Sequence, residues 1–122
     1  MNTRKPDPAG LVEADRPQRA VSIRRGSLYL PREMYDLYFA GAQTVALVAR
    51  EDKILVIPLV PGSAGGLLVK TRNARGDRVV HAQEFFRENG FAEDFQQHVV
   101  LAQWSPEAAA LVLSNLAKPQ GV

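Results

Sequence analysis

The sequence predicts an α+β domain of short antiparallel strands, with two or three short helices and a disordered arm at its N-terminus. Stretches rich in β-branched and aliphatic residues recur at short intervals, separated by Gly, Pro, Asn and Asp, as is typical of small antiparallel sheets. The chain has 122 residues, which suits one domain with one core. Hydrophobic residues make up 46% of it and charged residues 23%, an ordinary globular composition.

The N-terminal stretch predicts a flexible basic arm over residues 1–21, followed by a single folded domain over residues 22–118. Residues 1–21 are rich in Pro, Arg, Asp and Ala and have no hydrophobic periodicity. The formal net charge is only +2, from 15 Lys and Arg against 13 Asp and Glu. Because seven of the basic residues precede residue 33, positive charge is concentrated towards the N-terminus.

The first regular element is a short strand at residues 27–30. Leu28 and Leu30 point to one side and Ser27 and Tyr29 to the other, because side chains alternate along a strand. Pro31 ends the strand and suits the first turn of a helix, where its missing N–H is not needed.

The helix that follows carries an aromatic stripe. Its residues fall at helical spacing, and Gly41 is a C-terminal cap. So short a helix is stable only when packed. Its apolar residues cover more than one face, so they either fill the core or form an interface, and an interface is predicted for Met34, Tyr35, Tyr38 and Phe39.

A β-hairpin is predicted for residues 44–50 and 53–60, with Glu51 and Asp52 at its tip. The elements expected after it are a loop at 61–66, strands at 67–73, 78–82 and 98–104, and a helix at 82–90 with Phe85 and Phe86 inward.

The last segment, residues 105–118, has two interpretations. Ser105 as a cap, Pro106 in the first turn and apolar residues at helical spacing favour a helix. The alternative is a second strand over the sequence ALVLS.

The order of strand, proline-opened helix and hairpin resembles the AbrB/SpoVT and MraZ group of swapped-hairpin DNA-binding domains. The similarity is carried by GSLYLPRE at residues 26–33 and by Pro58 at the end of the hairpin. The group usually has arginine directly after the glycine, whereas this chain has Ser27 there and places Arg24 and Arg25 before the glycine. The resemblance implies a swapped-hairpin-like barrel, an obligate homodimer and binding to double-stranded DNA.

A second, degenerate copy of the pattern begins near residue 75. RVVHAQEFF at residues 78–86 follows the order of the first copy, with Gly76 one residue out of register relative to Gly26. The chain is therefore expected to contain two half-repeats, at residues 24–60 and 75–118, as in MraZ-like proteins.

Two basic clusters are candidate phosphate-binding sites, since clustered Lys and Arg bind nucleic acid through phosphate contacts and counterion release. In the first, Arg24 and Arg25 follow Arg16 and Arg19. The second comprises Lys70, Arg72, Arg75 and Arg78. The alternative is a solvated surface that aids solubility, with the 70–78 turn fixed by an internal ion pair of Asp77.

The leading functional hypothesis is a small DNA-binding regulator or antitoxin-like protein. On this hypothesis Arg24, Arg25, Arg75 and Arg78 contact DNA, while Lys70 and Arg72 position its backbone. The alternative is a non-enzymatic adaptor that meets an acidic protein partner through turn 70–78 and an apolar one through the aromatic helix.

Other classes lack support in the sequence. No cysteine is present, which excludes disulfides, thiol catalysis and Cys-ligated metals. His81 and His98 have no partners at metal-site or triad spacing, and the glycines before Lys70 do not fit a phosphate-binding loop. We expect neither an enzyme nor a cofactor nor a metal. The longest apolar run is too short for a bilayer, and the expected location is cytoplasmic.

Overall fold

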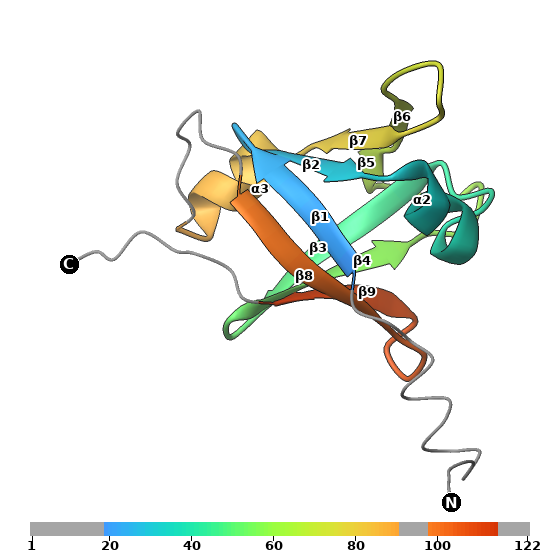
Figure 1. Ribbon diagram of the computed structural model, residues 1–122. Coiled ribbons are helices and arrows are strands. Elements are labelled where there is room, and N and C mark those ends of the chain that lie inside the picture. The colour runs from blue at the N-terminus through green and yellow to red at the C-terminus, as the bar shows by residue number, and fades with distance from the viewer. Residues whose placement is uncertain (1–18, 91–97, 115–122) are drawn as a thin grey trace, which may run out of the picture.

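The computed structural model describes residues 19–90 and 98–114. They form one nine-stranded antiparallel sheet that curls into a nearly closed barrel, with two short helices in these ranges (Figure 1). The first half contains β1 (Arg19–Arg24), β2 (Ser27–Leu30), α2 (Arg32–Tyr38), β3 (Thr44–Arg50) and β4 (Lys53–Pro58). The second contains β5 (Leu67–Leu68), β6 (Lys70–Thr71), β7 (Arg78–His81), α3 (Gln83–Glu88), β8 (His98–Ser105) and β9 (Ala110–Ser114).

The barrel closes because its two edge strands are consecutive in the chain. The strand order is β5-β3-β4-β9-β8-β1-β2-β7-β6, and only Val69 separates β5 from β6. β5 pairs with β3, and β6 pairs with β7. The Val69 N–H continues the first ladder by donating to the Gln43 carbonyl at 2.9 Å. The segment 67–71 therefore links the two ends of the sheet.

The two halves have the same element order, apart from the additional short strand β5 in the second, and they interlock. In each half, a strand pair is followed by a helix and a hairpin. The β8–β9 hairpin lies between β4 and β1 of the first half, while the β3–β4 hairpin lies between β5 and β9 of the second. Four ladders join the halves, because β1 pairs with β8, β2 with β7, β3 with β5 and β4 with β9.

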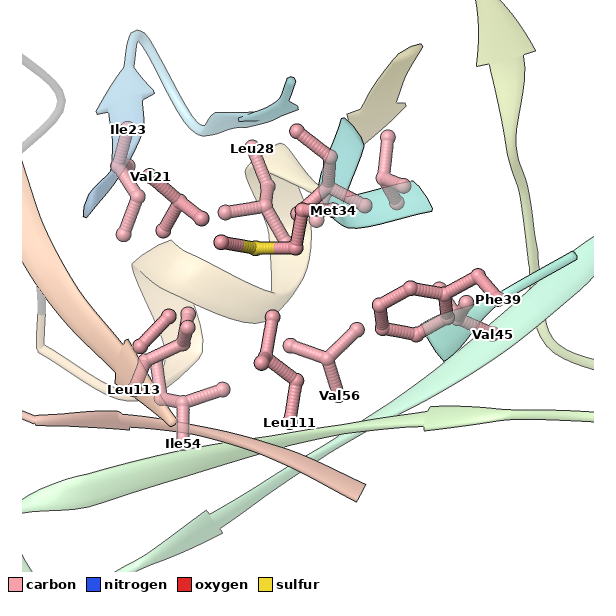
Figure 2. Packing of buried hydrophobic residues seen from close by; sticks show 14 of the residues in the cluster. Val21, Ile23, Leu28, Met34, Phe39, Val45, Ile54, Val56, Leu111 and Leu113 are labelled. Carbon is pink, nitrogen blue, oxygen red and sulfur yellow. The ribbon is translucent and has the colours of Figure 1, made fainter. Parts of the chain in front are cut away.

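The core lies inside the barrel (Figure 2). Leu28 on β2 and Ile54 on β4 supply completely buried side chains, and large rings are added by Phe39 at the end of α2 and by Phe86 within α3. Each such side chain contributes about 1.5–3 kcal/mol by leaving water, so the interior is the main source of stability.

The helix favoured over residues 105–118 is wrong, and the alternative strand is correct. The cap signal at Ser105 is real, but Ser105 Oγ accepts the Ala108 N–H at 3.2 Å inside a single turn. Ala109, with φ of 51°, then reverses the chain into β9. From Leu111 onward, buried Leu111 and Leu113 alternate with the less buried Val112 and Ser114, as expected for a strand. Residues 115–118 lie outside the described residues.

The strand β1 was not expected. Residues 19–21 belong to it and not to an arm, because Val21 and Ile23 alternate with solvent-facing residues and enter the core. Residues 1–18 of the predicted arm lie outside the described residues. The strand at 27–30, the hairpin, the strand near 78–82 and the helix within 82–90 are confirmed, whereas the expected strand at 67–73 is divided into β5 and β6.

The turn between β1 and β2 contacts the helix of the other half. Arg25 and Gly26 form a two-residue loop with φ of 55° and 75°, as tight hairpins require. The Gly26 carbonyl accepts the Ala82 N–H at 2.9 Å. A Cβ on Gly26 would lie 2.7 Å from Gln83 Cα, so glycine is needed for both conformation and close approach.

We expect Gly26→Ala to lower the free energy of unfolding by about 3 kcal/mol, through left-handed strain and a clash with the backbone of α3. Gly41→Ala is the matched control, since Gly41 has φ of 85° but no atom within 4 Å of an added Cβ. It should cost about 1 kcal/mol. Urea unfolding followed by circular dichroism measures both, and equal losses would contradict the contact with α3.

Candidate functional site

The outer side of β1, β2, β7 and β6 brings members of both basic clusters onto one surface. These four strands are neighbours in the sheet (Figure 1). Directly opposed residues share a side of an antiparallel sheet, and here Leu28 and Val80 face the core. The alternate rows therefore face outward. One row runs Ser22, Tyr29, Val79, Lys70, and the next runs Arg24, Ser27, His81. We call Arg24, Tyr29, Lys70, Arg72 and His81 the basic face.

Tyr29 stands at the centre of the basic face, with Arg72 over its ring. The Arg72 guanidinium carbon lies 4.8 Å from the ring centroid, in cation–π range. The Arg72 backbone N–H donates to the Asp77 carbonyl at 2.7 Å, which anchors the start of the loop between β6 and β7. The Arg72 side chain is exposed to solvent, whereas its backbone is fixed by this hydrogen bond.

The carboxylate of Asp77 organises that loop. Its Oδ1 accepts the backbone N–H of Arg32 at 2.9 Å. Its Oδ2 accepts from Asn73 Nδ2 at 3.0 Å and from Arg75 Nη2 at 3.1 Å. These hydrogen bonds, above all that from the Asn73 side chain, lower the pKa of Asp77 from 3.8 to about 2. The loop of the second half is thereby tied to the start of α2 in the first.

Two of the predicted DNA contacts, Arg75 and Arg78, are engaged inside the chain. Arg75 pairs with Asp77. The Arg78 guanidinium lies 3.9 Å from the centroid of the Tyr35 ring, and its Nε donates to the Gly76 carbonyl at 2.8 Å. Arg78 therefore contributes to the packing of α2, whereas the Arg75 side chain stays 79% exposed despite its pair with Asp77.

The remaining predicted contacts lie at the surface. Arg24 ends β1 and Arg25 occupies the turn, both exposed. They stand at the opposite end of the β2–β7 ladder from Arg78, because Ser27 faces His81 while Leu30 faces Arg78. Arg24, Lys70 and Arg72 nevertheless share one side of the barrel.

The sequence did not indicate the contact between Ser27 and His81. Ser27 Oγ lies 2.8 Å from His81 Nδ1, and Gln83 Nε2 donates to the same oxygen at 3.3 Å. Only 3% of the Ser27 surface is exposed, so the hydroxyl is inaccessible to a substrate. The group joins α3 to β2 and leaves the exposed His81 on the basic face.

The aromatic residues predicted as an interface pack inside the chain. Met34, Tyr35 and Phe39 are buried, and the Tyr35 hydroxyl donates to the Ala42 carbonyl at 2.8 Å. Tyr38 is partly exposed and stacks on Trp104, with ring centroids 4.9 Å apart. Three of the four side chains are therefore core residues in this conformation.

Within residues 19–90 and 98–114, no three His, Asp or Glu side chains are grouped to hold a metal ion. Neither described helix has the length and apolar character needed to cross a bilayer. Comparison with known proteins found no matching family model, no matching curated protein and no matching solved structure.

We expect Asp77→Asn to lower the free energy of unfolding at pH 7, because the amide binds Arg75 and the Arg32 N–H less well than a carboxylate. The lowered pKa means that Asp77 stabilises the fold above its unfolded value of 3.8, and that this contribution is lost as the pH falls towards about 2. The difference in free energy of unfolding between wild type and variant should therefore become smaller as the pH falls from 3.8 to about 2. Urea unfolding at several pH values tests this, and a difference that does not change with pH would contradict it.

Proposed function

We propose that the protein is a small DNA-binding regulator or antitoxin-like protein that binds the phosphates of double-stranded DNA on the basic face. One observation carries the proposal: the strand register aligns exposed cations from residues 24 and 70–72 on one side of the barrel. Phosphate contacts of this kind position a protein on the duplex and supply most of its salt-dependent affinity.

The spacing of the cations supports contact with more than one phosphate. Adjacent strands lie about 4.8 Å apart, so three strand spacings, or about 14 Å measured along the curved sheet, separate the strand of Arg24 from that of Lys70. Arg72 lies between them, over Tyr29 on β2. The formal net charge of the chain is only +2, so affinity depends on local clustering of these groups.

The interlocked halves support the resemblance to swapped-hairpin domains, since each hairpin lies between strands of the other half. Both halves belong to one chain, so no second copy is needed to complete the barrel. The expected homodimer, the cytoplasmic location and the DNA target therefore stay predictions.

The alternative adaptor function was expected to use the aromatic residues of α2 to contact a partner. Most of these residues are buried, so they do not offer that contact surface. One observation favours an apolar contact elsewhere. On β8, Val99 is 58% exposed and Leu101 37% exposed, and Leu101 lies beside Ala20 on the outer side of the barrel. An adaptor using these residues would bind an apolar protein surface and be indifferent to DNA.

Fluorescence anisotropy of a labelled mixed-sequence duplex, measured at several salt concentrations, tests the proposal. We expect Arg24→Ala/Lys70→Ala to weaken binding at least tenfold at low salt. The slope of log K against log salt should become shallower by about 2, or one for each phosphate contact removed.

The matched control is Arg50→Ala/Lys53→Ala, which removes the same charge from the exposed β3–β4 hairpin, away from the basic face. It should change affinity less than threefold. Equal losses in both variants would indicate non-specific attraction, and absence of binding by the wild type at low salt would remove the proposed function.

A further inference from the structure

A cavity of about 130 Å³ opens beside Tyr29 on the basic face. Its lining includes Ala20, Ser22, Tyr29, Pro31, Arg72 and Asp77. The lining residues thus include a tyrosine, small apolar residues, one arginine and one aspartate. This volume is well above what one water molecule needs, so the cavity has room for a small ligand.

The Arg72–Tyr29 contact is one that a planar ligand can enter. The Arg72 side chain is exposed, and its backbone is fixed to Asp77 by the 2.7 Å hydrogen bond. The guanidinium can therefore move off the ring without moving the loop. Stacking of a nucleobase on an aromatic ring is stronger than an exposed cation–π contact, and the guanidinium can then stack on the other side of the base.

The carboxylate in the cavity wall adds a preference among bases. Asp77 is ionised at neutral pH, since its pKa is about 2. A carboxylate has about four acceptor positions, and three hydrogen bonds, from Arg32, Asn73 and Arg75, reach this one. The Asp77 side chain is only 16% exposed, so an exocyclic amino group, which adenine and cytosine carry and thymine lacks, would have to reach the remaining acceptor position from inside the cavity.

We propose that this cavity binds one unpaired, amino-bearing nucleobase, stacked on Tyr29 beneath Arg72, while Arg24 and Lys70 hold the flanking phosphates. The inference rests on the proposed function and narrows its ligand from regular duplex to DNA with an extruded or bulged base. The base must be unpaired, because stacking within a duplex covers its faces.

The test uses the full chain and duplexes of one length that differ at a single central position. That position is fully paired, or carries an abasic, thymine, adenine or 2-aminopurine bulge. We expect the adenine bulge to bind at least fivefold more tightly than the abasic bulge, with thymine between them. The fluorescence of the 2-aminopurine bulge should fall on binding, because the base stacks on Tyr29.

Tyr29→Leu keeps an apolar side chain on β2 but removes the aromatic face. It should abolish both the fluorescence change and the preference for the adenine bulge over the abasic bulge. The comparison among bulged duplexes uses only the wild-type protein. It therefore tests the base site even if Tyr29→Leu fails to fold.

The outcomes separate the two proposals. Equal affinity for the paired, abasic and adenine-bulged duplexes, without a fluorescence change, overturns the base site and leaves phosphate binding intact. Absence of binding to every duplex overturns the proposed function and the base site with it.

Discussion

The single residue between β5 and β6 determines the shape of the molecule. Val69 leaves no room for a loop, so the chain must pass directly from the ladder with β3 to the ladder with β7, and the sheet must curl until those ladders meet. Closure covers the edges that would otherwise pair with other chains. It also brings Lys70 and Arg72 round to the strands that carry Arg24 and Tyr29. The basic face is thus a product of closure, assembled from segments that are about fifty residues apart in sequence.

Each half fixes the helix of the other. The Gly26 turn of the first half contacts the start of α3, and the Asp77 loop of the second half binds the Arg32 N–H at the start of α2. Both helices are too short to form independently. Their stability therefore depends on strand pairing that is distant in sequence, which makes the two halves one cooperative unit and favours slow folding.

Much of the fold could be predicted from the sequence, because local signals and tertiary structure agree. The alternation at residues 27–30 and the hairpin with Glu51 at its tip specify their own conformations. Strand β1 was missed because arginines and proline-rich sequence surround its two inward residues. β9 was predicted as a helix because the short apolar run at residues 110–113 fits the helical period as well as the strand period. The capping signal at Ser105 added to this, but it belongs to a turn. The candidate site depends on cross-strand register. Sequence therefore identified the cations but not which of them, such as Arg78, would be used internally.

The interlocking of the halves has a consequence for the integrity of the chain. The connection at residues 59–66 joins β4 to β5 and contains three exposed glycine residues, whereas four strand ladders run between the halves. A break in that connection would leave two fragments, each with an apolar sheet face that only the other covers. The covalent link there is dispensable for the pairings themselves, and its role is to hold the fragments at a high effective concentration. The pairing of the two halves therefore resembles the association of two different subunits, except that both belong to one chain.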